Sequence, residues 1–401
     1  MYRFRLFVAF VAVAFLLSSC CRYPWEHDDN ALKRTVLLYM VAENSLSSNG
    51  YNRFDLEELE EGAADIPSDC RMVVYVDDEG FPYLYALEKD KKGKVVHTVL
   101  KQYDTELDSS SKETLSDILS FVKAKYPSKS YGMIFWSHGS AWLPASRSIG
   151  IDNGKNTYSN TGTQMDISDL AEVLEAFGKL DFLLFDACFM QSIEVDWTLR
   201  NSAAYIIGSP AEIPGPGAPY NDIIAPMFDD KVDVQGIIDA YYHCYADSLY
   251  PTWYGSPYSF GVSLSAVKCD RLQQLFDVTE PLLEKYVSPD IDDDLIGVQR
   301  YNPVTSASRP EYYDLNGYMH HIIRSDEDYM AWKNAFDMAV PYRVTMDEWY
   351  SSYSYGMCSV DVDNYGGVSC FVPKNRAFYK QMMDWFRSTS WYSACWQPVG
   401  W

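Results

Sequence analysis

Residues 182–188 have the sequence Phe-Leu-Leu-Phe-Asp-Ala-Cys, in which a continuous apolar run meets a carboxylate and a thiol. Fifty residues earlier, the segment GMIFWSHG at 132–139 has the same form, and its apolar run leads to His138. Continuous runs of this length are typical of strands that are covered on both faces. The two segments therefore predict buried strands, each with a reactive side chain at its carboxyl end.

Similar apolar runs occur on both sides of this pair along the chain. The predicted strands are 35–42 (TVLLYMVA), 72–76 (MVVYV), 132–137, 182–185 and 204–208, with 83–87 and 95–100 as an exposed hairpin. Helical patterns separate several of these strands. Strands that alternate with crossover helices predict an α/β fold, with a mostly parallel sheet and helices on both faces.

Three helices are predicted in this part of the chain. In the first, 111–126, Ser111 is the N-cap, apolar residues recur at helical spacing, and a proline follows the last turn. In the second, 168–177, Ser168 is the N-cap and a glycine ends the helix. The third helix is expected to begin immediately after Cys188.

The pattern becomes less regular after about residue 270. Helical stretches are predicted near 271–287, 328–340 and 375–388, and strand-like runs near 356–362 and 367–372. We therefore expect an α/β domain at residues 32–269 and an α+β C-terminal subdomain at residues 270–401.

The N-terminal segment is predicted to be a targeting signal. Two arginines precede the apolar run Leu6–Leu17, which has the length of a signal peptide and is short for a membrane span. The run ends in Leu-Ser-Ser-Cys, which resembles the lipobox of bacterial lipoproteins, so residues 1–19 would be removed and Cys20 lipidated. Residues 20–31 would then tether the protein to the cell-envelope membrane, facing the periplasm or the outside. The alternative is an ordinary signal peptide followed by a chance cysteine.

The composition limits the classes of partner. The formal net charge of −23 excludes nucleic acid, because phosphate binding needs a basic surface. This acidity fits a solvated surface, or steering of basic substrates toward an acidic cleft. None of the nine cysteines stands at zinc-ligand spacing, so no structural metal and no required cofactor are predicted. Buried free thiols are at least as expected as disulfides, and we expect a monomer.

His138 and Cys188 are the candidate catalytic pair. The carboxyl ends of parallel strands meet at one edge of a sheet, where active sites collect. A cysteine at a helix N-terminus has a lowered thiol pKa, and a nearby imidazole supplies the base that a thiol nucleophile needs. The backbone N–H groups of Gly139 and Cys188 would then form an oxyanion hole. The alternative is that His138 is an ordinary loop residue and Cys188 part of the core.

Four segments resemble motifs of the clostripain family of cysteine peptidases. They are LYMVAENS at 38–45, WSHGS at 136–140, FDACFMQSIEV at 185–195 and GSPAEIPGPGAPY at 208–220. These matches run in order over roughly residues 33–270. The C-terminal third resembles the family only loosely, through YDL at 313–315 and GVSCF at 367–371.

The resemblance implies a caspase-like fold and an endopeptidase that cleaves proteins or peptides after Arg or Lys, with Cys188 and His138 as a dyad and a thioester intermediate. It places Asp186 at the floor of the S1 pocket, which receives the P1 residue preceding the cleaved bond, and Glu212 in the lining of that pocket. A buried carboxylate at this place would select a basic P1 residue. The alternative role for Asp186 is that of a helix N-cap beside Cys188.

Two properties of family members stay open at this point. One is self-cleavage between the histidine and the cysteine, for which Arg147 and Lys155 are candidates. The other is calcium dependence, which rests on the resemblance alone because no ligand set is visible in the sequence. Two other functions also stay open: a cysteine peptidase with a non-basic P1 preference, and a catalytically silent caspase-like lipoprotein acting as a surface binding module. The presence of both dyad residues disfavours the silent lipoprotein.

Overall fold

The computed structural model describes residues 31–143, 148–247, 261–288, 295–302, 312–374 and 380–401. Residues 32–401 pack as one compact unit. The predicted signal peptide, Cys20 and Arg147 lie outside the described residues. Within the described ranges, no helix combines the length and the apolar character that crossing a membrane requires.

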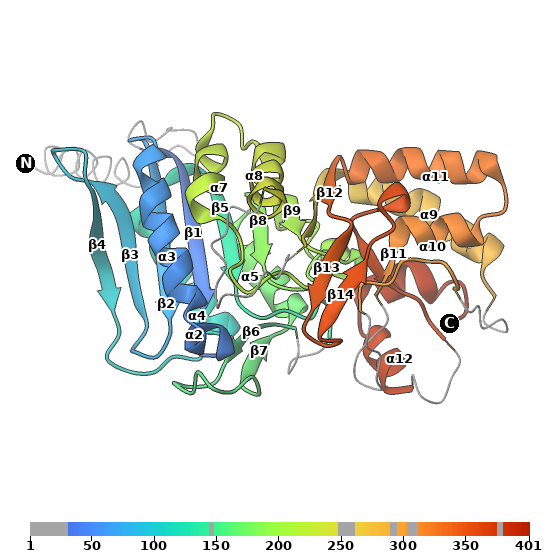
Figure 1. Cartoon of the computed structure of the whole chain (residues 1–401), viewed down its shortest axis with the longest axis horizontal. Coiled ribbons are helices and arrows are strands. Elements are labelled where there is room, and N and C mark those ends of the chain that lie inside the picture. Colours follow the sequence, from blue (N-terminus) through green and yellow to red (C-terminus); the bar gives the residue numbers. More distant parts are fainter. Residues whose placement is uncertain (1–30, 144–147, 248–260, 289–294, 303–311, 375–379) are drawn as a thin grey trace, which may run out of the picture. The chain divides into compact units, whose positions relative to one another are not determined.

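A nine-stranded sheet runs through this unit (Figure 1). Its strands lie in the order β12-β10-β9-β8-β5-β1-β2-β3-β4. Their bounds are β1 Leu32–Val41, β2 Cys70–Asp77, β3 Tyr83–Lys89, β4 Val95–Gln102, β5 Ser128–Trp136, β8 Leu180–Asp186, β9 Ala203–Gly208, β10 Ser263–Lys268 and β12 Tyr342–Thr345. β2, β1, β5, β8 and β9 run parallel, and antiparallel strands complete both edges. The predicted α/β fold with a mostly parallel sheet is confirmed.

Helices cover both faces of the sheet (Figure 1). α4 (Lys112–Lys125) and α5 (Ile167–Phe177) belong to the core on one face, whereas α3 (Tyr51–Gly62), α7 (Tyr220–Phe228) and α8 (Val234–Ala246) belong to the core on the other. Strand β1 contributes Leu37 and Tyr39 to the first core, and Val36 and Leu38 to the second. Because successive side chains of a strand point to opposite faces, its continuous apolar run needs a helical layer on each side.

Of the three helix starts predicted from the sequence, the structure confirms one and corrects two. Ser111 caps α4, since its side chain accepts a hydrogen bond from the Thr114 N–H. The prediction that Ser168 caps α5 is wrong, because Asp166 two residues earlier accepts the Ser168 N–H and starts the helix sooner. The prediction of a helix immediately after Cys188 is also wrong, because α6 (Ile193–Thr198) begins only after its own cap, Ser192.

The C-terminal third shares the central sheet, since β12 pairs with β10 beyond the expected boundary at residue 269. Its other elements are α9 Leu272–Tyr286, β11 Tyr312–Asp314, α10 Leu315–Ile322, α11 Asp326–Ala339, β13 Glu348–Ser351, β14 Gly356–Ser359, β15 Ser369–Phe371 and α12 Lys380–Phe386. The strands form two short ladders, β11 with β15 and β13 with β14. The three helical stretches and two strand-like runs predicted here overlap α9, α11, α12, β14 and β15, although residues 375–379 are not described.

All seven cysteines among the described residues are free thiols. Five of them are buried: Cys70, Cys244, Cys269, Cys370 and Cys395. No disulfide therefore cross-links the described part of the chain.

Candidate active site

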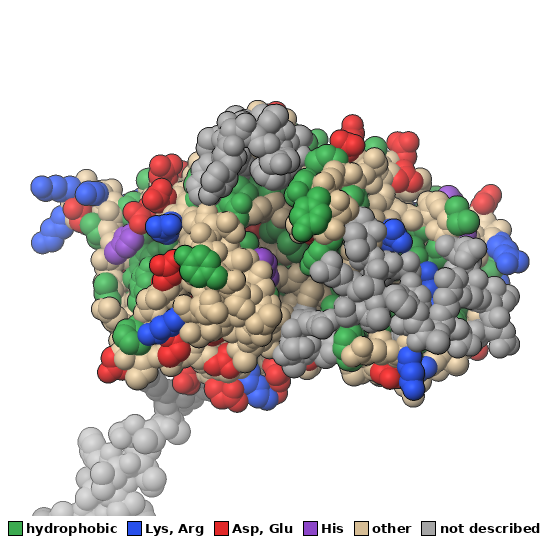
Figure 2. Space-filling view, turned by 60° about the horizontal axis from the view of Figure 1, so that its bottom comes forward, with side chains coloured by type: hydrophobic (Ala, Val, Ile, Leu, Met, Phe, Trp, Pro, Cys, Tyr) green, Lys and Arg blue, Asp and Glu red, His purple; other side chains and the backbone are tan. Residues whose placement is uncertain are grey.

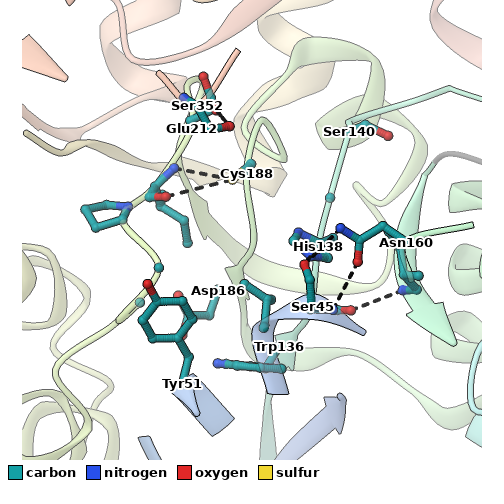
Figure 3. A pocket seen from close by; sticks show the side chains of 18 of the residues that line it. Ser45, Tyr51, Trp136, His138, Ser140, Asn160, Asp186, Cys188, Glu212 and Ser352 are labelled. Atoms are coloured by element: carbon teal, nitrogen blue, oxygen red, sulfur yellow. Dashed lines mark hydrogen bonds between the residues drawn. The ribbon is translucent and has the colours of Figure 1, made fainter. Parts of the chain in front are cut away.

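Three parallel strands bring the catalytic candidates to one edge of the sheet. In the β-ladder register, Trp136 of β5 pairs with Met40 of β1 on one side and with Asp186 of β8 on the other. His138 and Cys188 each follow two residues after this pair, so both leave the sheet at the same edge. A cleft of about 940 Å³ lies here, and both residues line it. The surface is hollowed on the face shown in Figure 2, and Figure 3 shows the residues around the pocket.

The sequence interpretation missed the side chain that contacts His138 and the second side chain that holds it in place. Its Nε2 lies 3.0 Å from Ser45 Oγ, in the short helix α2 (Ser45–Ser48) after β1 (Figure 3). Asn160 fixes this serine, since its Nδ2 donates to Ser45 Oγ at 2.8 Å and its Oδ1 accepts the Ser45 N–H at 3.0 Å. Burial lowers the pKa of His138 to about 4, so the imidazole is neutral at pH 7 and able to accept a proton.

Cys188 lies in the turn between β8 and α6, not at the start of a helix. Its Sγ accepts the Ile213 N–H at 3.4 Å and lies 4.0 Å from the Ile213 carbonyl oxygen. The next residue, Phe189, has a φ of 64°, in the left-handed region that side chains other than glycine seldom adopt. Such a conformation costs of the order of 1–2 kcal/mol, so the turn that carries Cys188 is strained.

The expected lowering of the Cys188 pKa does not occur. Burial raises the pKa of this thiol to about 12, and the nearby Glu212 carboxylate adds to the rise. The physical reason is that α6 starts too far along the chain for its dipole to act on the sulfur, because dipole effects fall off within the first turn. In this conformation the two catalytic candidates are therefore a neutral thiol and a neutral imidazole.

The two catalytic candidates line the same cleft but each contacts its own partner. The hydrogen bonds described for Cys188 Sγ join it to Ile213, and the one described for the His138 ring joins it to Ser45 (Figure 3). Gly139 brings the two loops together, since a Cβ there would lie 2.8 Å from the Cys188 carbonyl oxygen. Only glycine permits this close approach of the loop that carries His138 to the backbone of the turn that carries Cys188.

Asp186 lines the cleft next to Trp136, with its carboxylate buried. Its Oδ2 accepts the Tyr220 hydroxyl at 2.8 Å and the Ala218 N–H at 3.2 Å, and its Oδ1 accepts the Tyr241 hydroxyl at 3.4 Å. Burial nevertheless raises the pKa of Asp186 to about 6. The alternative role as a helix N-cap is excluded because Ser192 caps α6.

A second buried carboxylate lies behind the cleft wall. Trp136 Nε1–H donates to Asp55 Oδ2 at 2.5 Å, and Asp55 comes from α3. The pKa of Asp55 is raised well above its usual range, mainly by burial and to a smaller extent by repulsion from Asp186. The cleft wall thus carries the Asp186 carboxyl, and a second carboxyl with a raised pKa, that of Asp55, lies behind it.

Of the remaining predicted site residues, Glu212 lines the cleft and Lys155 lies in a loop outside its lining. Glu212 lines the cleft, and its Oε1 accepts the Ser352 hydroxyl at 2.5 Å and the Ser352 N–H at 2.9 Å. Lys155 lies in the loop between β6 (Ile149–Asp152) and β7 (Thr163–Met165), where its Nζ is 3.5 Å from a Glu106 carboxylate oxygen. Its side chain is partly exposed, and its φ is 71°.

One group of carboxylates outside the cleft lining has the spacing of a metal site. Glu43, Asp77, Glu106 and Asp152 each offer an oxygen within 4.8 Å of the others. The sequence interpretation missed this set because its members come from four separate segments. The available signal was that Glu43 and Asp77 directly follow or end apolar runs that become neighbouring parallel strands.

Comparison with known proteins agrees with this geometry. The sequence model of the clostripain family matches residues 38–399. Clostripain from Hathewaya histolytica is 25% identical over an alignment of 223 positions, which covers 48% of this chain and 41% of that protein. The chain thus matches less than half the length of this curated relative.

Two solved structures resemble the chain over most of its length. A secreted C11 cysteine protease from Bacteroides thetaiotaomicron, in complex with an irreversible peptide inhibitor, is 33% identical with a TM-score of 0.78. An inactive zymogen of a C11 protease from Parabacteroides distasonis is 29% identical with a TM-score of 0.77. Each similarity covers 91% of this chain and 99% of the other. With a family match that runs from the first strand to the C-terminal residues, the chain belongs to the clostripain family of cysteine peptidases.

Proposed function

We propose that the protein is an exported cysteine endopeptidase that cleaves peptide bonds after Arg and Lys, with Cys188 as nucleophile and His138 as base. The observation that carries the proposal is the buried carboxylate of Asp186 in the cleft wall, two residues before the nucleophile. The substrates would be proteins or peptides whose P1 side chain enters the pocket beside Trp136.

The dyad would act through a neutral thiol. As the substrate displaces Cys188 from Ile213, the Sγ proton passes to His138 while a bond forms between Sγ and the scissile carbonyl carbon. Gly139 and Cys188 N–H groups would stabilise the oxyanion. The C–N bond then breaks, His138 returns the proton to the leaving amine, and water hydrolyses the thioester.

The acidic floor supports a basic P1 residue. A Lys or Arg side chain that reaches Asp186 would form a charge-assisted hydrogen bond in a desolvated pocket. The Tyr220, Ala218 and Tyr241 donors already orient the carboxylate, so it needs no rearrangement on binding. Loss of such a buried charge pair costs about 2–5 kcal/mol.

A panel of fluorogenic peptides that differ only at P1 tests this specificity on the full-length chain. We expect turnover after Arg and Lys, and a fall of at least about tenfold in kcat/KM for these substrates in Asp186→Asn. Asp117→Asn, an exposed change in α4, is the matched control and should leave kcat/KM unchanged. Efficient cleavage after neutral residues would exclude the basic pocket and favour the alternative preference.

A small thiol reagent separates specificity from structural support. If Asp186 acts on P1, its replacement by Asn leaves the labelling rate of Cys188 unchanged. Equal slowing of labelling and of all substrates would assign Asp186 to support of the nucleophile turn. Normal labelling without turnover of any peptide would instead favour the silent binding module.

We also propose that the mature chain begins at a lipidated Cys20, which would hold the peptidase at the cell envelope. The proposal rests on the Leu-Ser-Ser-Cys end of the apolar run. Intact-mass analysis of protein extracted from membranes should find an acylated N-terminal cysteine. An unmodified terminus at another residue would leave an ordinary signal peptide.

Self-cleavage stays a proposal with two candidate sites. Lys155 is partly exposed in the β6–β7 loop, whereas Arg147 lies outside the described residues. N-terminal sequencing of fragments from active protein and from Cys188→Ala would show which bond, if either, the chain cuts in itself.

A further inference from the structure

The imidazole ring of His138 has two nitrogens, and one of them is engaged by Ser45. Nε2 lies 3.0 Å from Ser45 Oγ, and this is the hydrogen bond described for the ring (Figure 3). Nδ1 is therefore the nitrogen left to receive the proton of Cys188. A nitrogen accepts a proton only through its lone pair, so a base that works through Nδ1 must carry its own proton on Nε2.

The hydroxyl of Ser45 decides which ring nitrogen is protonated. Burial lowers the pKa of His138 to about 4, so the ring carries a single proton at pH 7. That proton lies on Nε2 if Ser45 Oγ accepts from the ring, and on Nδ1 if the Ser45 hydroxyl donates to it. Only the first arrangement leaves a lone pair on Nδ1 for the thiol proton.

Asn160 determines what the Ser45 hydroxyl can do. The backbone N–H of Ser45 can only donate, so the Asn160 atom that lies 3.0 Å from it is the acceptor Oδ1. This fixes the orientation of the carboxamide, and Nδ2, which lies 2.8 Å from Ser45 Oγ, is the donor. Asn160 thus occupies one lone pair of the hydroxyl oxygen and cannot take its proton. The second lone pair is available to the Nε2–H of His138.

The segment that carries Ser45 is fixed by the residue before it. Asn44 accepts the Leu46 N–H at 3.0 Å, and its Nδ2 donates to the carbonyls of Val41 and Ile151, each at 2.9 Å. These bonds join the end of β1, the first turn of α2 and strand β6. Ser45 is therefore held in position before any substrate binds.

The loop that carries Asn160 is attached to the same place. Asn153 donates from Nδ2 to the carbonyls of Glu43 and Ser159, each at 2.7 Å, and its Oδ1 accepts the Thr161 N–H at 3.2 Å. The residues on both sides of Asn160 are thus bound to Asn153, which is itself bound to the residue two before Ser45. A supporting residue that is locked in this way can fix the geometry of a catalytic group.

We propose that Ser45 and Asn160 are positioning residues that hold His138 in its Nε2–H form and so leave Nδ1 to act as the base. The inference rests on the dyad proposed above. In its first step the Sγ–H bond of Cys188 breaks and an Nδ1–H bond forms, while Nε2–H continues to donate to Ser45 Oγ. Neither Ser45 nor Asn160 gains or loses a proton.

Nuclear magnetic resonance of the histidine ring tests the proposal without any peptidase assay. The full-length chain is labelled with ¹⁵N-histidine, and the ring signals of His138 are assigned by their absence in His138→Ala. At pH 7 we expect the Nε2–H form alone in the unaltered chain, and a mixture of Nε2–H and Nδ1–H forms in Ser45→Ala. An unaltered chain in the Nδ1–H form, or an unchanged ring spectrum in Ser45→Ala, would overturn the proposal.

Kinetics with a fluorogenic peptide that carries Arg at P1 give a second readout. We expect kcat to fall about tenfold in Ser45→Ala and KM to change less than about twofold, because Ser45 acts on the proton transfer and not on substrate binding. Ser45→Thr keeps the hydroxyl and should restore the Nε2–H form and most of kcat. Equal kcat values in Ser45→Ala and the unaltered chain would contradict the positioning role.

Ser48→Ala is the matched control, because it removes another hydroxyl of α2, one that donates to the Ser45 carbonyl at 3.0 Å. It should leave both the ring spectrum and kcat unchanged. If circular dichroism shows that Ser45→Ala does not fold, Asn160→Ala takes its place. That change lets the Ser45 hydroxyl turn its proton toward Nε2, so we expect a mixed ring spectrum and a kcat lowered several-fold. An unaltered spectrum in Asn160→Ala would refute the role of Asn160.

The two readouts separate this inference from the proposed function. If the unaltered chain cleaves no peptide, the proposed peptidase activity fails, whereas the ring spectrum still shows whether Ser45 sets the form of His138. If the chain cleaves peptides after Arg but carries its ring proton on Nδ1, the peptidase proposal stands and the positioning role is refuted.

Discussion

Removal from solvent keeps both residues of the proposed dyad neutral. The Cys188 thiol, with a pKa raised to about 12, and the His138 imidazole, with a pKa lowered to about 4, are both neutral across the physiological range. The sulfur also contacts Ile213 rather than the histidine. The proposed mechanism therefore needs the substrate to displace Cys188 from Ile213 before the proton can pass to His138.

Removal of either dyad residue should abolish turnover without unfolding the protein. We expect Cys188→Ala and His138→Ala each to lower kcat by at least about 10³-fold, because each residue takes part in the same proton transfer. Peptide hydrolysis and the thermal unfolding midpoint are measured together. Retention of wild-type turnover by either variant would refute the dyad.

The rate of Cys188 alkylation should rise with pH, as expected for a thiol that is neutral at pH 7. Since the reactive species is the thiolate and its pKa is raised, the rate with iodoacetamide should climb about tenfold per pH unit from pH 7 to 9. His138 stays neutral above about pH 4, so no inflection is expected near 6.5. The rate is followed by mass spectrometry of the peptide that contains Cys188. A plateau between pH 5 and 7 would instead indicate a thiolate paired with an imidazolium.

At the scale of single elements, the observed and the predicted N-cap residues of α4 and α5 can be compared by their effect on stability. Ser111→Ala and Asp166→Ala should each lower the free energy of unfolding by about 1 kcal/mol, because each removes the acceptor for a first-turn N–H. Ser168→Ala removes a side chain inside the first turn of α5. It should lower the free energy of unfolding by only about 0.3 kcal/mol. Urea unfolding of the three variants gives the order. An effect of Ser168→Ala equal to that of Asp166→Ala would contradict the observed cap.

The strands could be predicted because each buried strand contains a continuous apolar run, as 182–185 and 132–137 show. Their starts could not, because β8 begins at Leu180 and β5 at Ser128, before the apolar run in each. The site was less accessible to such patterns. Ser45, the hydrogen-bond partner of His138, and Asn160, which holds Ser45, come from two distant segments, and no local periodicity connects them. The late start of α6 was missed because the turn at 187–191 depends on backbone contacts with residues 209, 211 and 213, which only the folded chain brings together.

At the scale of the whole molecule, the C-terminal third supports the turn that carries Cys188. Ser369 of β15 donates its N–H to the Gln191 carbonyl at 2.9 Å, and the Phe371 N–H donates to Glu194 Oε1 at 2.8 Å. Ser352, beside the β13–β14 hairpin, holds Glu212 at the cleft. The region after residue 269 therefore supports the active site as well as the sheet edge.

A chain truncated after residue 269 should consequently be inactive. It loses β12 from the sheet edge and exposes the β10 backbone, so we also expect aggregation. Activity toward a peptide substrate and light scattering are compared with those of the complete chain. A soluble, fully active truncated chain would show that residues 32–269 suffice for catalysis.

The seven free thiols have a consequence for biogenesis. A protein sent to an oxidising compartment commonly depends on disulfide-forming catalysts, and its folding yield then follows their supply. Here two apolar cores and the sheet stabilise the described fold, and five of its free cysteines are buried. Its maturation should be indifferent to the loss of thiol oxidases, and the protein should fold equally well in a reducing host cytoplasm.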